Sequence, residues 1–109
     1  MNVYDTANKL ASEIRASSEY LDYKKVKEYI NSNSELKEKV KAFETARYEA
    51  QIDVMQGNQN SEKIMKVQNL YSELLKNDEM KKYFDAELKF NLMLTDVNRI
   101  IGESVKDVM

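Results

Sequence analysis

The sequence has no cysteine, no histidine and no proline, and glycine occurs at only two of its 109 positions. The lack of cysteine excludes disulfides, thiolate nucleophiles and iron-sulfur or zinc-thiolate sites. The lack of histidine removes the commonest metal ligand and general base. Without proline, and with much Lys, Glu, Leu, Met and Ala, the composition favours nearly continuous helix. We therefore expect an all-α protein that is not an enzyme and holds no metal and no cofactor.

Long apolar runs and a basic face are also missing. No apolar stretch approaches the roughly 20 residues that span a bilayer, and the N-terminus lacks the basic and apolar regions of a signal peptide. Seventeen basic and nineteen acidic residues give a net charge of −2, and the two signs are mixed along the chain rather than gathered in blocks. Proteins that bind phosphate backbones carry clustered basic residues. We expect a soluble, cytoplasmic protein without direct contact to nucleic acid or membrane.

The apolar residues recur with the helical period along most of the chain. A length of 109 residues suits a single domain with a modest core. The pattern predicts two N-terminal helices within residues 1–31, then long antiparallel helices over residues 34–57 and 61–102, with a kink or break at residues 77–78. Residues 103–109 are expected to form a flexible tail. The predicted fold is an antiparallel helical hairpin or bundle of four to five helices, with long third and last helices.

Polar residues and glycine predict where these helices begin and end. Ser32 and Glu35 have capping-box spacing at the start of the third helix, and Ser34 is an alternative cap. Gly57 stands where a helix end favours a left-handed residue, before a polar turn at residues 58–61. Either residue of Asn77-Asp78 could cap the last helix.

Tyrosine and methionine are frequent, with seven and six copies. Their helical spacing among charged residues is typical of side chains that are half-buried, with the tyrosine hydroxyls in contact with water. The alternative is an exposed patch of these residues that binds a partner helix.

In the second helix the pattern predicts four buried residues, namely Leu21, Val26, Tyr29 and Ile30.

The last helix carries apolar residues on two flanks, which a single neighbouring helix cannot cover. At about 100° per residue, one flank holds Phe90, Leu94, Val97 and Ile101, and the other holds Phe84, Leu88 and Leu92. This distribution indicates assembly with a second chain rather than chemistry. The predicted oligomer interface comprises Phe84, Leu88, Phe90, Leu94, Val97 and Ile101.

A narrow polar strip lies between these flanks and consists of Glu87, Asn91, Thr95 and Asn98. Arg47 similarly interrupts the apolar stripe of the third helix. A buried carboxylate is tolerated only when it is paired, so we predict that Glu87 pairs with Arg47, within one chain or across a dimer, and fixes helix register. The alternative is a polar ligand pocket around the same buried residues, Arg47, Glu87, Asn91 and Asn98.

Several segments together resemble a known family. They are Asn2-Val3-Tyr4-Asp5 with Ala7 and Leu10, Ser18-Glu19-Tyr20, Phe43-Glu44 with Arg47, Ala86-Glu87-Leu88 and Asp96-Val97-Asn98-Arg99-Ile100-Ile101. This set is similar to the YlbF/YmcA/YheA family of small bacterial helical proteins, and closest to its YheA-like branch. The C-terminal segment is the most specific part, and the similarity covers nearly the whole chain.

The resemblance implies an all-helical fold with long antiparallel helices and a dimer or larger oligomer in the cytoplasm of Gram-positive bacteria. Better-studied relatives act in a complex that influences RNA processing by a membrane-bound ribonuclease, with effects on competence, sporulation and biofilm formation. Such relatives can carry cysteines tied to iron-sulfur clusters, which this chain lacks, so that cofactor does not transfer. The turn at Met55-Gln56-Gly57 also follows Phe43 earlier than in the family pattern.

Two functions follow as expectations. The first is a non-enzymatic interaction or adaptor protein whose partner is a second copy of itself. The alternative is an accessory regulator of RNA processing, whose partners are other proteins of a ribonuclease-associated complex. The sequence identifies no individual partner.

Overall fold

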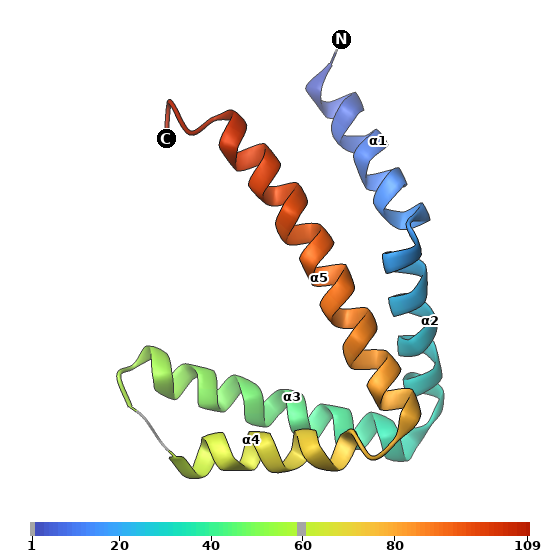
Figure 1. Cartoon of the computed structure of the whole chain (residues 1–109), viewed down its shortest axis with the longest axis vertical. Coiled ribbons are helices and arrows are strands. Elements are labelled where there is room, and N and C mark those ends of the chain that lie inside the picture. Colours follow the sequence, from blue (N-terminus) through green and yellow to red (C-terminus); the bar gives the residue numbers. More distant parts are fainter. Residues whose placement is uncertain (1, 59–60) are drawn as a thin grey trace. The chain divides into compact units, whose positions relative to one another are not determined.

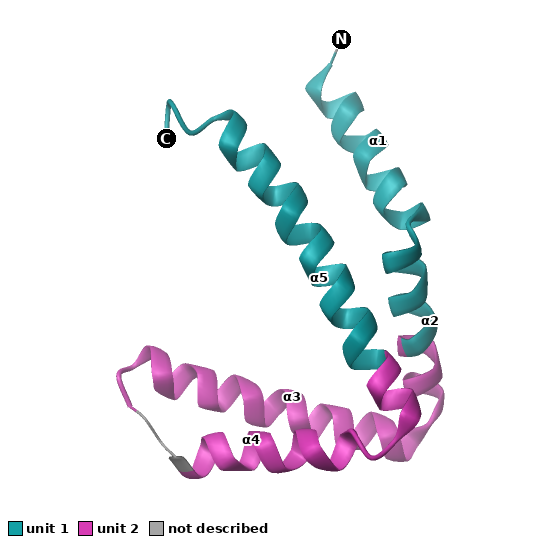
Figure 2. Ribbon diagram, in the orientation of Figure 1, with its two compact units in different colours: residues 1–26, 83–109 teal, residues 27–82 magenta. Residues whose placement is uncertain are grey.

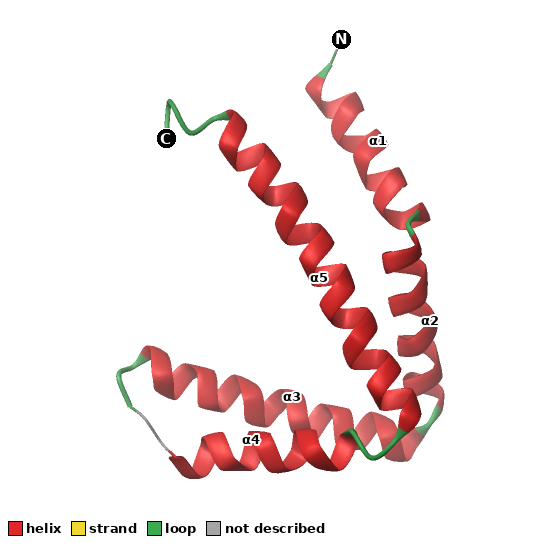
Figure 3. Cartoon of the chain, viewed as in Figure 1, coloured by secondary structure: helices red, strands yellow, loops and turns green. Residues whose placement is uncertain are grey.

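The computed structural model describes residues 2–58 and 61–109, and these residues form helices and short connections without any strand (Figures 1 and 3). The prediction of an all-α fold with long third and last helices is confirmed, since α3 has 22 residues and α5 has 27. The helices are α1 (Val3–Ala16), α2 (Ser18–Ser32), α3 (Ser34–Met55), α4 (Ser61–Leu74) and α5 (Asp78–Ser104).

Asn33 caps the start of α3. Its backbone is extended, with φ −112° and ψ 103°, and its Oδ1 accepts a hydrogen bond from the Leu36 amide at 3.1 Å. The prediction of Ser32 or Ser34 as the cap is therefore wrong. Ser32 is the last residue of α2, where its hydroxyl donates to the Tyr29 carbonyl at 2.7 Å, and Ser34 is already helical. Asparagine is as good a cap as serine, so the sequence alone did not separate them.

Asn77 caps α5 after a full break in the helix. Its Oδ1 accepts hydrogen bonds from the amides of Glu79 at 2.8 Å and Met80 at 3.3 Å. Of the two residues proposed from sequence, Asn77 is thus the cap, and Asp78 is the first residue of α5, where its charge favours the helix N-terminus.

Gly57 ends α3 in the left-handed conformation that the sequence predicts, with φ +82°. Its amide donates to the Val54 carbonyl at 3.1 Å, and the Asn58 amide donates to the Asp53 carbonyl at 2.8 Å. These two bonds form a Schellman motif, which satisfies carbonyls that the helix itself leaves unpaired. Of the expected turn at residues 58–61, Gln59 and Asn60 lie outside the described residues.

The chain divides into two compact units (Figure 2). The first, here called the terminal unit, comprises Met1–Val26 and Tyr83–Met109. The second, here called the hairpin unit, comprises Lys27–Lys82.

The hairpin unit contains the larger apolar core. Helices α3 and α4 run antiparallel side by side, with the Phe43 and Tyr71 ring centroids 5.9 Å apart (Figure 1). Its described buried residues are Ile30, Leu36, Phe43, Ala46, Leu74 and Met80. Lys63 on α4 pairs with Asp53 on α3 at 3.0 Å near the turn, and Lys39 approaches Glu73 at 3.9 Å. The core and these pairs hold α3 against α4.

The terminal unit is held by aromatic rings from α2 and α5. Tyr23 lies 5.8 Å from Tyr83 and 5.4 Å from Phe90, between ring centroids, and Tyr20 lies 6.1 Å from Phe90. Tyr83 and Ala86 are buried here. Helix α1 lies wholly within the described residues and has none that is buried, so α2 and α5 supply the core of this unit.

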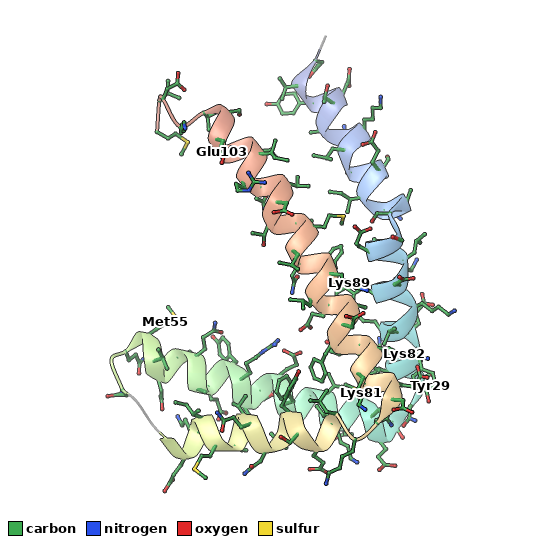
Figure 4. All side chains as sticks on the ribbon, viewed as in Figure 1. Tyr29, Met55, Lys81, Lys82, Lys89 and Glu103 are labelled. Carbon is green, nitrogen blue, oxygen red and sulfur yellow. The ribbon has the colours of Figure 1, made fainter. Side chains whose placement is uncertain are left out.

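Fewer residues of α2 are buried than the sequence predicts. Ile30 is buried and Val26 half-buried, but Leu21 and Tyr29 are exposed, and Figure 4 labels Tyr29. The prediction is therefore wrong for Leu21 and Tyr29. Apolar periodicity marks the residues that favour burial, whereas the number of neighbouring helices decides how many are covered.

Candidate interaction surface on α5

One apolar flank of α5 faces the chain's own aromatic core. We call Phe90, Leu94, Val97 and Ile101 the inner flank. Phe90 contacts Tyr20 and Tyr23, and Leu94 and Val97 are half-buried. Only Ile101, in the last turns of the helix, is exposed. Most of this flank is thus already partly covered within the single chain.

The other flank, Phe84, Leu88 and Leu92, is here called the outer flank. Leu88 is 58% exposed and Leu92 is 55% exposed. Phe84 is half-buried, with its ring edge-on to Tyr83 at 5.3 Å between centroids. The six residues predicted as an interface are therefore distributed over two flanks, and the outer flank is the less covered.

The polar strip meets the aromatic core at one residue. The Tyr23 hydroxyl donates to Glu87 Oε2 at 3.3 Å, and Glu87 is half-buried. Asn91, Thr95 and Asn98 are exposed in the single chain. The sequence does not predict the bond between Tyr23 and Glu87, and its only signal for such a bond is the high number of tyrosines among charged residues.

Arg47 is exposed on α3 and has partners on its own helix. Its guanidinium pairs with Glu44, one turn earlier, and lies 5.3 Å from the centre of the Phe43 ring. Their spacing of three residues makes this pair readable from the sequence. Arg47 belongs to the hairpin unit and Glu87 to the terminal unit, and the pairing of Arg47 with Glu87 stays a prediction.

Arg47, Asn91 and Asn98 of the predicted polar set are each exposed. Among the residues that the structure describes, no polar or charged side chain is fully buried. The described residues also contain no group of three acidic side chains arranged to hold a metal ion. No helix in the described part of the chain is long and apolar enough to cross a membrane.

The fold and this surface define a small all-helical protein with an exposed apolar face on its longest helix. The family model described as control of competence regulator ComK, YlbF/YmcA, matches residues 3–106. The chain therefore belongs to the YlbF/YmcA family, as its sequence resemblance predicts.

Relatives in several bacteria are similar over nearly their full length. A UPF0342 protein of Desulfitobacterium hafniense is 32% identical over 115 residues, which cover 100% of this chain and 89% of the relative. A UPF0342 protein of Caldicellulosiruptor saccharolyticus is 32% identical over 99% of this chain and 92% of its own length. A UPF0342 protein of Streptococcus pyogenes serotype M4 is 30% identical over 98% of this chain and 96% of its own length. The family description concerns regulation, and neither it nor these names mention a reaction.

Proposed function

We propose that this protein is a non-enzymatic helical interaction protein that self-associates through α5. The observation that carries the proposal is the outer flank, where Leu88 and Leu92 are more than half exposed on the longest helix. Two neighbouring leucines on a regular helix form an apolar surface that a second helix can cover.

The free energy available from these leucines is too small to hold two chains together. Fully burying a leucine gains about 1.5–3 kcal/mol, so covering the exposed halves of two gains roughly 2–3 kcal/mol. Association costs about 4–15 kcal/mol in lost rigid-body freedom. The contact must therefore extend beyond the outer flank.

Further exposed apolar residues lie near the end of α5 and along α1, both in the terminal unit. Ile101 near the end of α5 is exposed, as are Val3, Ala7 and Ala11 on α1, a helix without a buried residue. A stable dimer buries about 800 Å² per partner, roughly 20 residues a side. We propose that the six predicted residues of α5 form the centre of the interface and that α1 supplies part of its rim.

Light scattering after size exclusion tests self-association directly. Wild type should elute with the mass of a dimer or larger, and Leu88→Asp should shift it to a monomer, because a carboxylate placed in an apolar contact loses its hydration. Leu21→Asp is the matched control, since Leu21 is a 51% exposed leucine of the same unit outside the predicted interface.

A wild-type chain that stays monomeric at micromolar concentration would overturn this proposal. An equal loss of mass in both variants would place the contact elsewhere than on α5. Phe90→Asp is a poorer test than Leu88→Asp, because Phe90 packs against Tyr20 and Tyr23 and its loss would disturb the fold itself.

A second function is favoured by the family description, which names control of a competence regulator. We propose, as the alternative, that the protein is an accessory regulator of RNA processing within a ribonuclease-associated complex, as in better-studied relatives. Affinity purification of the wild-type chain from native cells tests this, with Leu88→Asp in parallel. Reproducible co-purification of a ribonuclease supports the alternative, and its absence from a preparation that retains self-association contradicts it.

A further inference from the structure

The terminal unit contains a groove that is distinct from the outer flank around Leu88. It lies between the start of α2 and the middle of α5 and has a volume of about 540 Å³. Its apolar floor consists of Leu92, Met93, Val97 and Ile100, and Ile100 is 61% exposed. Leu92 is shared with the outer flank and Val97 with the inner flank, whereas Met93 and Ile100 belong to the groove alone.

The polar rim of this groove is mainly acidic. Glu19 and Asp22 line it from α2, and Asp96 lines it from α5. Lys89 is the one cation of the lining, and it lies on the side of α5 that faces α2 (Figure 4). Lys89 is already paired with Asp85 at 3.1 Å. The rim therefore presents more negative charge than its own lysine offsets.

The negative charge of Asp96 is offset only weakly by its nearest cation. Arg99 approaches Asp96 at 3.9 Å, and both side chains are more than half exposed. An exposed pair at that distance contributes at most a few tenths of a kcal/mol. Glu19 accepts a bond from the Ser18 hydroxyl at 3.0 Å, which leaves its charge in place.

The shape and charge together point to one class of occupant. We propose that the groove binds an amphipathic helix of a partner protein whose apolar anchors are flanked by lysine or arginine. Helices bind grooves through apolar residues at i, i+3, i+4 and i+7, and complementary rim charges select the partner and speed its encounter. Anionic lipid headgroups and nucleic acid are repelled by the three carboxylates. This inference rests on the proposed function, because it names the partner class of an interaction protein.

A designed peptide tests the groove on the full-length chain. The probe is a fluorescent helix of about 18 residues, or five turns, with leucine at the anchor positions and lysine beside them. The matched probe has the same leucines with glutamate in place of lysine. We expect the cationic peptide to bind, with fluorescence anisotropy rising on titration, and the acidic peptide to bind at least about tenfold more weakly.

Charge reversal locates the binding. Asp22→Lys with Asp96→Lys should weaken binding of the cationic peptide by at least about tenfold and strengthen binding of the acidic peptide. The control is Glu13→Lys with Asp107→Lys, which changes the net charge equally in the same unit but outside the groove lining. All four positions are exposed, so the helical circular dichroism of each variant should match wild type. The control variant should bind the cationic peptide as wild type does.

Three results would overturn the groove proposal. The first is that the cationic peptide does not bind, and the second is that both double variants weaken its binding equally. The third is that Asp22→Lys with Asp96→Lys converts an oligomer to a monomer, because a second copy of the chain would then occupy the groove. Light scattering on the same samples separates this from the proposed function. A monomeric wild type that still binds the peptide refutes self-association alone, and an oligomer that ignores the peptide refutes the groove alone.

Discussion

At the scale of single residues, the structure distinguishes side chains that stabilise the fold from side chains available for contact. Met80 is 0% exposed and Tyr83, three residues later, is buried as well. Met65 on α4, in contrast, is 58% exposed. Methionine fills irregular spaces in a core and is also common at binding surfaces, so its identity alone predicts neither environment.

Replacing Met80 by alanine should therefore destabilise the protein far more than replacing Met65. Met80→Ala removes a fully enclosed side chain and should lower the free energy of unfolding by about 2–5 kcal/mol. Met65→Ala, at an exposed site, should change it by no more than about 0.5 kcal/mol. Urea denaturation at one fixed protein concentration measures both, and equal effects would mean that the Met80 environment is not a core.

At the scale of elements, the helix ends are set by local geometry. Asn33 and Asn77 each accept backbone amides at a helix start, and Gly57 adopts φ +82° at a helix end. Gly102 also lacks a side chain but lies inside α5, where an added Cβ would meet nothing within 4 Å. The two glycines have opposite structural roles.

Alanine substitutions at the two glycines should consequently change stability in opposite directions. Gly57→Ala forces a side chain into the left-handed region and should cost about 1–2 kcal/mol. Gly102→Ala improves helix propensity in open space and should stabilise the protein by up to about 1 kcal/mol. Thermal melts of the two variants beside wild type give the comparison, and a shift of both in the same direction would contradict it.

At the scale of the whole molecule, the apolar surface is divided between the chain's own cores and faces open to a partner. Among the residues that the structure describes, the hairpin unit buries six apolar residues and the terminal unit two. The terminal unit also contains α1, without a buried residue, and the exposed leucines of α5. This imbalance is the reason that we place both proposed contacts, self-association and the acidic groove, in the terminal unit.

The predicted pairing of Arg47 with Glu87 is a property of this same scale, because the two residues belong to different units. If they pair, Arg47→Ala should lower the melting temperature, and a double-mutant cycle of Arg47→Ala with Glu87→Gln should show a coupling of about 0.5 kcal/mol or more. Arg47→Ala with Asp85→Asn is the control cycle, since Asp85 on the same helix pairs with Lys89. Additive effects in both cycles would refute the pairing.

Local rules account for much of what the sequence predicts correctly. The left-handed Gly57 follows from backbone sterics, and the interruption near Asn77 follows from capping chemistry. The error at Ser32 has the same origin, because Ser32 and Asn33 are neighbouring residues with nearly equal capping strength. Local rules fix the type of an element better than its last residue.

The sequence alone predicts the all-helical class, the long third and last helices, the two apolar flanks of α5 and the family. These depend on composition, on period and on the identity of residues near one another in the chain. Which flank is covered depends on the tertiary structure, because Phe90 contacts Tyr20 and Tyr23 whereas Leu88 remains exposed. The tertiary structure also brings Glu19 and Asp22 of α2 to the rim of the same groove as Asp96 of α5. Periodicity defines a face, but what covers that face is set by distant residues that the fold brings beside it.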